Sequence, residues 1–508
     1  GMDSERSSAP DHPDLTVHFL GKRVARVRKT YLLSGSSPGN LVKCYNNTIL
    51  GMERALKERL FYIPAGDGWV PRPTHERGYV LSTLSESILA LKNFSRKTHP
   101  LDRLEYSLSF AGQKQKRYLK ASESLGRTGI LRKHAILKFF MKFEAYNLHV
   151  KGNPSPRGIN PPSDEYLVEL GRYIKPIEKL IYKALRELFG FIVVLKGFNQ
   201  QQRGRIISDY WKEFDDPIGI AADASKFEQS VSAECIEVER LVYSAYYSDN
   251  VVSKLMGWQK FYRGKGSTTD GYLSFKIGGV RASGMPNTAL GNCLLSCLMA
   301  HTIFRILAIK RYRFVCDGDD VHFIMERRDS ERFRDYARTY YQRLGFRMKM
   351  EHTVDVLEHI DFCQSRPVKV NGTYLMVRNV VNALSKDSLA KKPLDNRKVF
   401  LRWIAAVGEG GLSMTGGIPI MQEYYSSLIR SACGARPLVG DPVQSDYDRG
   451  PKMFREYEPV SEETRYSFWL AFGIYPDDQR AIENYYRRFS LVFGVCEEEL
   501  VDYPTLPW

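Results

Sequence analysis

Cysteines and uninterrupted apolar runs are scarce in this sequence. Eight Cys among 508 residues are too few for a disulfide framework, and their spacings match no zinc signature. Cys293 and Cys297 lie one helical turn apart without a nearby His or Cys partner, so they are predicted to be packing residues of a helix. The longest apolar run, residues 288–309, is interrupted by Asn292 and other polar residues, which favours a buried helix over a membrane span. Because residues 1–30 also lack the apolar core of a signal peptide, we expect a soluble protein of a reducing, intracellular compartment.

Other absences exclude whole classes of enzyme. The sequence contains no Gly-x4-Gly-Lys-Ser/Thr motif, and the nearest match, at residues 264–267, lacks the upstream glycine. A P-loop helicase is therefore excluded. We find no methyltransferase or protease signature, so capping and processing would belong to other proteins. Internal repeats and low-complexity tracts are absent as well.

Acidic residues are too few to balance the basic ones. The chain has 74 Lys and Arg against 58 Asp and Glu, a formal net charge of +16. Residues 114–157 contain eleven cations and two acids, whereas residues 441–508 contain 14 acids and 7 cations. In the first segment several lysines stand among apolar residues and precede a Pro-rich loop. A cationic wall beside such a loop suits a polyphosphate or a nucleic-acid backbone, with a solvated surface as the alternative.

Short β-like runs alternate with helix-length segments in the middle of the chain. Residues 218–222, 312–316 and 321–325 are interpreted as strands, and residues 234–247, 289–309 and 330–344 as helices. After residue 395 the pattern is mostly helical. Two stretches rich in Pro or Gly, 153–162 and 408–417, are interpreted as boundaries between structural units. The sequence therefore predicts an α+β fold with a helical C-terminal part.

Three carboxylates fall within four residues, at Asp317, Asp319 and Asp320. The flanking residues alternate in polarity, which predicts a β-hairpin with these aspartates at its tip. Asp and Gly are also common in purely structural turns. Clustered carboxylates repel one another, however, and a divalent cation relieves that repulsion. Mg²⁺ takes a few carboxylate oxygens together with substrate phosphates, so the hairpin is a candidate metal site.

Two further segments place polar residues where they suit catalysis. The apolar run 217–222 ends at Asp223, which either faces the hairpin across a metal pair or caps a helix, and Glu228 follows five residues later. The glycine-rich loop at 278–287 contains Ser283 and leads into a helix on which Thr288 and Asn292 share one face. These hydroxyl and amide groups can hydrogen-bond a sugar hydroxyl or a template backbone. Helix capping is the alternative interpretation.

Together these elements resemble the palm motifs of viral RNA-dependent RNA polymerases, in the order in which that family has them. The match is closest to the replicases of tombusvirus-like plant viruses. It extends to residues 45–62, to a nucleotide-channel motif at 142–161, to a primer-grip segment at 361–368, and to thumb segments at 416–419 and 466–474. The resemblance covers roughly residues 41–490, and six motifs in the family order make it specific.

The resemblance implies a closed right-hand polymerase with fingers, palm and thumb, an antiparallel palm sheet and a helical thumb. The expected parts are residues 41–216 (fingers), 217–235 and 278–368 (palm), 236–277 (an insertion of the fingers), and 369–508 (thumb and acidic C-terminal region). Residues 1–40 are expected to be a basic segment packed on the fingers or the thumb. The acidic residues 441–508 are either a solvated thumb surface, which we favour, or a tail that folds back on the basic cleft.

The family also implies roles for individual residues. Asp223 and Asp319 would ligate two Mg²⁺ ions, for which Mn²⁺ can substitute, and Asp320 would support this metal site. The remaining implied roles are holding the incoming triphosphate (Lys142, Lys151 and Arg157), reading the ribose 2′-hydroxyl (Glu228, Ser283, Thr288 and Asn292) and protonating pyrophosphate (Lys349).

Two positions depart from the family pattern. Glu228 stands where an Asp is usual, so its carboxylate reaches one methylene further than in the family. Pro162 stands where a second Arg usually follows the Asn-Pro step, so the channel has one cation fewer, for which Arg132 or Lys133 would compensate.

The function implied is template-directed synthesis of RNA from NTPs on single-stranded RNA, by the catalytic subunit of a positive-strand RNA virus replicase. Expected partners are template and nascent RNA, NTPs, and a membrane-anchored viral replication protein or N-terminal extension, because we find no transmembrane segment. The expected location is the host cytoplasm, at membrane-bound replication complexes. Whether residues 1–508 are a fragment of a longer readthrough product is left open. The alternatives are a catalytically silent RNA-binding protein with a palm fold and, less favoured, a reverse transcriptase.

Overall fold

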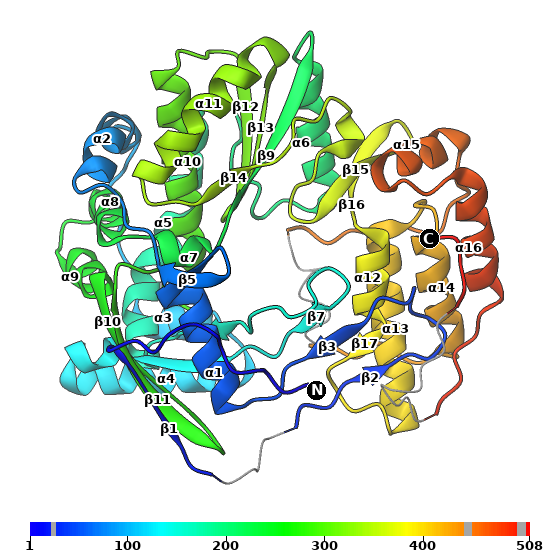
Figure 1. The fold of residues 1–508 in the computed structure, drawn as a ribbon, viewed down its shortest axis with the longest axis horizontal. Coiled ribbons are helices and arrows are strands. Elements are labelled where there is room, and N and C mark those ends of the chain that lie inside the picture. Colours follow the sequence, from blue (N-terminus) through cyan, green and yellow to red (C-terminus); the bar gives the residue numbers. More distant parts are fainter. Residues whose placement is uncertain (22–26, 441–449, 495–503) are drawn as a thin grey trace.

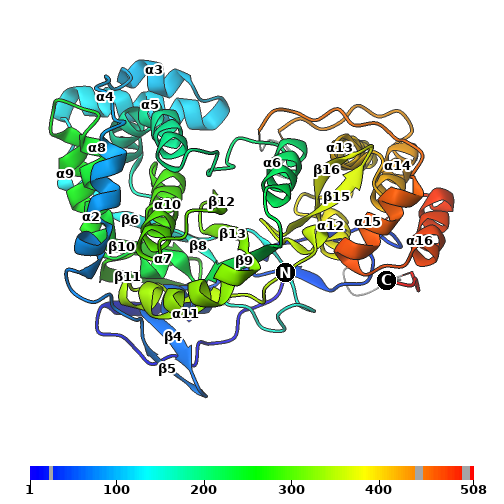
Figure 2. The same ribbon diagram turned by 90° about the horizontal axis from the view of Figure 1, so that it is seen from above.

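A four-stranded antiparallel sheet occupies the central part of the molecule (Figure 2). The structure is a computed structural model that describes residues 1–21, 27–440, 450–494 and 504–508 (Figure 1). Phe304 and Phe333, from two helices packed on the sheet, stack with 5.1 Å between ring centroids, and both contact Phe323 of a central strand. This aromatic core fixes the hairpin that carries the predicted aspartates. The strands, in order across the sheet, are β12 (Tyr312–Asp317), β13 (Asp320–Glu326), β9 (Pro217–Ala224) and β14 (Met348–Met350), and the helices are α10 (Thr288–Ile306) and α11 (Arg327–Arg343).

A second, five-stranded sheet lies at one end of the molecule (Figures 1 and 2). One face is buried against α1 (Ile49–Leu56), because alternate residues such as Leu273, Phe275 and Ile277 point inward. The opposite residues of each strand are exposed, as the period of two requires. Its strands, in order, are β1 (Leu15–Phe19), β11 (Gly271–Gly278), β10 (Phe261–Thr268), β6 (Leu137–Met141) and β8 (Gly158–Ile159).

Helices surround both sheets, and most of their buried residues join one large hydrophobic core. The longest helix, α5 (Asp164–Phe189), has Ser163 as its N-cap and ends at Gly190 in the left-handed conformation, both favourable capping choices. The other elements of this part are η1 (Lys57–Phe61), α2 (Tyr79–Lys92), α3 (Arg103–Leu108), α4 (Gly112–Thr128), η2 (Arg132–Ala135), α6 (Gln200–Lys212), α7 (Phe227–Ser230), α8 (Ala233–Ser244), α9 (Val251–Gly257), η3 (Trp258–Lys260), β4 (Tyr62–Ala65) and β5 (Gly68–Pro71).

Residues after about 365 build a second hydrophobic core of their own. The N-terminal segment joins the two parts, because β1 pairs with the five-stranded sheet whereas Leu33 is buried in the second core. The elements here are β15 (Ser365–Val370), β16 (Thr373–Arg378), α12 (Val380–Asp387), α13 (Arg397–Thr415), α14 (Met421–Ser431), α15 (Glu462–Phe472) and α16 (Pro476–Arg488). The short η4 (Leu357–His359) precedes them, and two small strand pairs are β2 (Tyr31–Leu32) with β17 (Leu389–Ala390) and β3 (Val42–Cys44) with β7 (Ala145–Asn147).

The glycine-rich stretch 408–417 is not a boundary, contrary to the sequence interpretation. Helix α13 continues through it to Thr415. A Cβ on Gly408 would meet backbone atoms of Ile429 and Tyr425 at 3.0 Å, and one on Gly411 would meet the Tyr425 ring at 2.2 Å. These glycines therefore let α13 and α14 approach closely, and their small size rather than their flexibility explains the pattern.

The main predicted elements are confirmed. The hairpin β12–β13 extends the predicted strands by one residue on each side of the turn, and β9 includes Asp223 instead of ending before it. Helix α10 has the length and apolar composition of a membrane span, but 78% of that window is buried within the protein. This burial agrees with the predicted core helix.

Candidate functional site

The predicted aspartates gather at one end of the four-stranded sheet. Gly318 has a positive φ of 67° that forms the tight turn, with Asp319 at its tip and Asp320 paired with Asp317 across the hairpin. On the other side of β13, Asp320 pairs with Asp223, and Asp223 in turn pairs with Lys349 of β14. Side chains at directly paired positions share one face of the sheet. The sheet register thus brings into one row residues that are up to 126 positions apart in the chain.

Helix α10 supports the hairpin turn from below. The Gly318 N–H donates to the Cys293 sulfur at 3.1 Å, and the Ser296 hydroxyl donates to the Gly318 carbonyl at 3.0 Å. Cys293 and Cys297 are buried, which confirms the prediction that they pack inside a helix. Because both hydrogen-bonding groups of Gly318 have partners, the carboxylate turn stands on a fixed base.

The carboxylates at the tip repel one another and are poorly hydrated. Desolvation raises the pKa of Asp319 to about 7, and repulsion by Asp320 and Glu228 adds to this rise. Desolvation likewise raises the pKa of Asp320 to about 6, with further repulsion from Asp317 and Asp223. Both side chains reach solvent at their ends, but they stand in a concave region where protein restricts hydration. The site therefore favours a bound cation.

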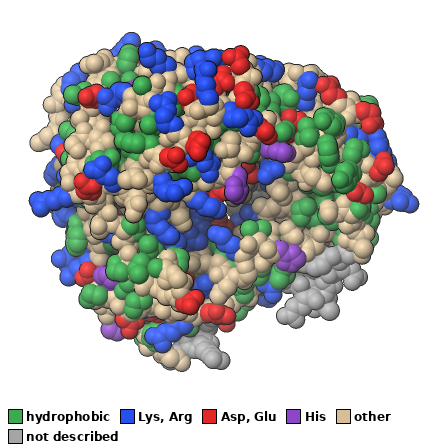
Figure 3. Space-filling view, turned by 45° about the horizontal axis from the view of Figure 1, so that its top comes forward, with side chains coloured by type: hydrophobic (Ala, Val, Ile, Leu, Met, Phe, Trp, Pro, Cys, Tyr) green, Lys and Arg blue, Asp and Glu red, His purple; other side chains and the backbone are tan. Residues whose placement is uncertain are grey.

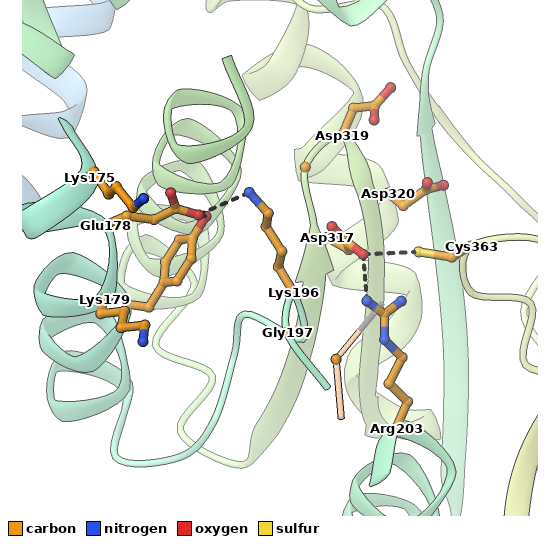
Figure 4. Close-up of a pocket in the computed structure, with 13 residues that line it drawn as sticks. Lys175, Glu178, Lys179, Lys196, Gly197, Arg203, Asp317, Asp319, Asp320 and Cys363 are labelled. Carbon is orange, nitrogen blue, oxygen red and sulfur yellow. Dashed lines mark hydrogen bonds and ion pairs between the residues drawn. The ribbon is translucent and has the colours of Figure 1, made fainter. Parts of the chain in front are cut away.

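A cavity of about 730 Å³ opens in front of the hairpin. In Figure 4, Asp317 points toward Arg203 and Cys363, whereas Asp319 stands further along the turn, away from Arg203. The guanidinium of Arg203 lies 2.7 Å from Asp317, so this third carboxylate is already neutralised by the protein. Figure 3 shows Lys and Arg gathered around a hollow near the centre of the face it draws. Lysines that line the cavity are Lys175, Lys179 and Lys196.

The donor set suits a hard divalent cation, although its side chains are spread apart. Among the residues that the structure describes, no three Asp, Glu, His or Cys side chains form a ready metal-binding group. Asp223 and Asp320 are a cross-strand pair, however, whose Cβ atoms typically lie roughly 4.5–5.5 Å apart. Oxygen-only donors and mutual repulsion fit Mg²⁺ or Mn²⁺ chemistry.

The predicted triphosphate-binding cations lie on an exposed loop facing this site. Arg157 lies close enough to Asp319 to lower the pKa of that carboxyl, although desolvation and Asp320 outweigh this effect. Arg157 and Lys142 both pair with Glu144, at 3.1 and 3.7 Å. Lys151 is exposed further along the loop. All three are thus solvent-accessible, and the ion pairs of Lys142 and Arg157 with Glu144 are weak enough to exchange for a phosphate.

Sequence reasoning missed the residues that hold this loop. The Arg59 guanidinium donates to the carbonyls of Pro156 and Ser155 at 2.8 and 2.6 Å, and Arg54 donates to the Asn153 carbonyl at 3.0 Å. No sequence signal marks these arginines, because each acts on a loop about 100 residues away.

A lysine inside the Asp223–Glu228 motif was also missed. Lys226 has a positive φ of 54° and donates to the Glu58 carbonyl. Burial lowers the pKa of this ammonium to about 8, and repulsion from Arg59 and Arg347 adds to the effect. The position of Lys226 between Asp223 and Glu228 was the sequence signal that could have identified it as a site residue.

The predicted sugar-reading residues are engaged within the protein. Ser283 donates to the Gly158 carbonyl at 3.3 Å, and Thr288 donates to the Ala282 carbonyl at 3.0 Å. Asn292 is only 6% exposed, and its amide oxygen accepts a hydrogen bond from Arg281 at 3.0 Å. The structure therefore places all three around the loop that precedes α10, where they fix its shape. Glu228 is half-buried and stands next to Asp319, whose pKa it raises.

Lys349 lies near the aspartates, as predicted, whereas Arg132 lies elsewhere. Lys349 is opposite Asp223 in the sheet, but its side chain is 73% exposed and lies 3.3 Å from Glu351. Arg132, suggested as a compensating cation, packs on Trp258 with 5.5 Å to the ring centroid and donates to the Phe261 carbonyl. Arg132 therefore packs beside the five-stranded sheet, and among the described residues it has no contact with Arg157.

Comparison with known sequences identifies the family. A model described as viral RNA dependent RNA polymerase matches residues 16–493. The chain belongs to this family. The predicted resemblance to replicases of tombusvirus-like viruses is thereby confirmed, and with it a mixed helix and strand fold of the right-hand polymerase class.

Viral polymerases of this family align with the chain over nearly its whole length. Proteins named RNA-directed RNA polymerase are 35% identical over 97% of the chain in Maize chlorotic mottle virus and 34% identical over 91% in Tobacco necrosis virus strain D. That of Turnip crinkle virus is 33% identical over 98% of the chain. The chain spans 51%, 65% and 64% of these three relatives, so each of them has further regions.

Proposed function

We propose that this chain is the catalytic part of an RNA-directed RNA polymerase that copies single-stranded RNA from NTPs in a positive-strand RNA virus replicase. The observation that carries the proposal is the row Asp320–Asp223–Lys349 in the four-stranded sheet, with Asp319 at the adjacent turn and a cationic loop facing it. The four-stranded sheet would be the palm, the part around the five-stranded sheet the fingers, and the part after residue 365 the thumb of a closed right hand. The separate hydrophobic core of the part after residue 365 supports the proposed thumb, whereas both sheets share the other core.

The carboxylates would hold the metal ions of the reaction. Asp223, Asp319 and Asp320 are the proposed ligands, and two Mg²⁺ ions, or Mn²⁺, are the proposed cofactors. When bound, such ions activate a 3′-hydroxyl and stabilise the charge of the leaving pyrophosphate. The Arg203 contact keeps Asp317 outside this set, so the turn offers two carboxylates and not three.

The chain's own residues would position the nucleotide. Lys142, Lys151 and Arg157 would bind the triphosphate in exchange for their contacts with Glu144 and water. Glu228, whose carboxylate contributes to the raised pKa of Asp319, would accept a hydrogen bond from the ribose 2′-hydroxyl. Ser283, Thr288 and Asn292 would act indirectly, by supporting the sugar-binding loop. Lys349 would turn away from Glu351 to donate a proton to pyrophosphate.

The test is incorporation of radiolabelled NTPs on a short single-stranded RNA with Mg²⁺. We expect template-dependent RNA product and at least roughly tenfold lower kcat/KM with dNTPs, because the loss of one hydrogen bond from the 2′-hydroxyl to a carboxylate costs about 1.5 kcal/mol or more. Equal use of NTPs and dNTPs would instead indicate the alternative reverse transcriptase. RNA binding without product under all metal conditions would indicate a catalytically silent palm protein.

We further propose that the polymerase acts in the host cytoplasm at membrane-bound replication complexes. The support is the greater length of the relatives, which leaves room for an anchoring region or a separate membrane-anchored viral protein as partner. Co-sedimentation of the chain with membranes from infected cells, but not from uninfected cells, would test this partner.

Replacement Glu228→Asp is expected to keep most of the polymerase activity. The shorter carboxylate retains the charge beside Asp319 and still accepts a hydrogen bond from a 2′-hydroxyl. We expect kcat/KM for NTPs to stay within about tenfold, or roughly 1.4 kcal/mol, of the wild type. Glu228→Gln is the matched control, since it keeps the length and removes the charge. A loss beyond roughly 2 kcal/mol in the Asp variant would show that the extra methylene is required.

Binding of Mg²⁺ is expected to tighten roughly 100-fold between about pH 5.5 and about pH 7.5. Protons compete with the metal for Asp319 and Asp320, whose pKa values are raised to about 7 and about 6 by desolvation and mutual repulsion. As the pH rises through these values both carboxyls ionise, so the affinity rises and then levels off. Isothermal titration in buffers of different ionisation enthalpy measures both the affinity and the protons released. The double variant Asp319→Asn/Asp320→Asn should lose this dependence, and a flat wild-type profile would contradict the assignment.

A further inference from the structure

The outward face of the five-stranded sheet is strongly basic. Alternation along the strands places Lys138, Arg263, Lys265 and Lys276 on this face, and all four side chains are exposed. Strands β1, β6, β8, β10 and β11 contain no Asp or Glu. None of the four cations forms an ion pair or a side-chain hydrogen bond with any residue that the structure describes. The positive charge of this face is therefore not compensated within the described structure.

The cations are paired with one another across the sheet. Arg263 lies directly opposite Lys276 in the antiparallel β10–β11 pair, and Lys265 lies beside Lys138 in the parallel β10–β6 pair. Like charges at directly opposed positions destabilise a sheet. Folding alone gives no reason for this arrangement, whereas a bound polyanion does, because its phosphates relieve the repulsion.

Aromatic side chains stand among these cations. Phe140, Phe261 and Tyr272 are 44%, 45% and 48% exposed on the same face. The Tyr272 ring stacks on His18 of β1, with 4.6 Å between the ring centroids, which holds it as a flat platform. Exposed aromatic rings on a flat sheet accept unpaired bases, which double-stranded RNA and phosphate alone do not offer.

A groove of about 350 Å³ runs across the same face. Arg263, Lys265 and Lys276 line it, with Thr16 of β1 and the acidic Asp14 on the N-terminal side. The carboxylate cavity in front of the hairpin shares no lining residue with this groove. Figure 1 also shows β1, β10 and β11 at the lower left of the molecule, away from β12 and β13.

We propose that the outward face of the five-stranded sheet is a second RNA-binding surface that holds single-stranded RNA outside the catalytic cavity, with Lys138, Arg263, Lys265 and Lys276 on the phosphates and Tyr272 and Phe140 under the bases. The choice of RNA as the polyanion rests on the proposed function. The single-stranded form follows from the aromatic platform. This surface would retain the part of a long RNA that is not in the cavity.

The test is fluorescence-anisotropy binding of single-stranded RNAs of about 8 and about 30 nucleotides without NTPs or metal, because a surface of this kind covers on the order of ten nucleotides. The test variant replaces all four cations by Gln. We expect weaker binding of the long RNA, by roughly tenfold or more at moderate salt. The slope of log K against log[salt] should fall by up to about 3, or about 0.7 for each phosphate that the protein no longer neutralises. Binding of the short RNA, which the cavity can hold alone, should change little.

Two further variants separate charge from stacking and from general effects. Tyr272→Ala should weaken binding of the long RNA about fivefold or more while leaving the salt slope unchanged, because stacking releases no counterions. Lys212→Gln/Lys310→Gln is the matched control: both lysines are exposed and form no ion pair with described residues, and both lie at the end of the four-stranded sheet opposite to the aspartates. The control should bind like the wild type.

The outcomes distinguish this proposal from the polymerase assignment. Long-RNA binding that survives all four substitutions would overturn the second surface and leave the polymerase proposal intact. If the variant keeps its RNA affinity but has a raised KM for NTPs, the face serves nucleotide delivery instead. If the variant loses only its binding to phosphatidylserine vesicles, the face binds a membrane. A wild-type protein that binds neither RNA would contradict both proposals. The melting temperature of the Arg263→Gln/Lys276→Gln pair should not fall, since only a repulsive contact is removed.

Discussion

The Asp319→Ala variant is expected to lose template-dependent NTP incorporation by at least about 10³-fold, because metal-ion stabilisation of the reacting oxygens contributes several kcal/mol to the barrier. Asp319 stands at the tip of the hairpin turn, and Asp320 and Glu228 raise its pKa by repulsion in addition to desolvation. Removing this carboxylate relieves the repulsion and leaves the support of Gly318 by α10 intact. The fold and the affinity for RNA should therefore persist, which assigns the loss to chemistry.

The matched control for this variant is Asp215→Ala. Asp215 precedes the opposite end of β9, and its side chain is 91% exposed beside Arg311 at 3.6 Å. It offers the same change in charge away from the proposed metal site, so activity should stay near that of the wild type. Measurement of single-nucleotide extension on a primed template gives kcat and KM separately. Equal product from Asp319→Ala and wild type would show that the metal assignment is wrong.

The Arg281→Met variant is expected to lower the free energy of unfolding by about 3–5 kcal/mol, the usual cost of breaking a fully buried ion pair. Arg281 and Glu239 lie 2.8 Å apart, and both side chains are completely buried. Arg281 also donates to Asn292, while Asn287 and Tyr243 donate to Glu239 at 3.0 and 2.9 Å. Methionine fills most of the space but leaves the Glu239 carboxylate buried with neutral partners only. Urea unfolding followed by circular dichroism measures this change.

The loss in Arg281→Met should come from the unpaired buried charge of Glu239 and not from the change in side-chain shape. The double variant Arg281→Met/Glu239→Met should recover much of the loss, since it leaves no unpaired charge.

Arg240→Met provides the matched control for the buried pair. Arg240 pairs with Glu237 on the same helix, α8, but the two side chains are 30% and 19% exposed. Lys260, at 2.7 Å from Glu237, and water still compensate the remaining carboxylate there, so the expected loss is below about 1 kcal/mol. If Arg281→Met and Arg240→Met cost the same, burial does not control the energetics of this network.

The parts of the site that are formed by residues close together in the chain could be predicted from the sequence. Alternating residues around Asp317-Gly318-Asp319-Asp320 predict the hairpin, because the period of two and a turn-forming Asp-Gly pair are properties of residues close together in the chain. The apolar run before Asp223 predicts β9 for the same reason. The order of these motifs was sufficient to indicate the family, which the match over residues 16–493 confirms.

Contacts between residues far apart in the chain could not be predicted in this way. Arg203 neutralises Asp317 although the two are 114 residues apart, and Arg59 holds a loop 96 and 97 residues further along. The glycines of α13 suggested a break because sequence shows their flexibility but not the neighbouring α14 that requires their small size. Likewise, the row of Asp320, Asp223 and Lys349 depends on the strand register. Local propensity acts between residues a few positions apart, whereas these contacts arise from packing and sheet pairing of the whole chain, which a short sequence pattern does not contain.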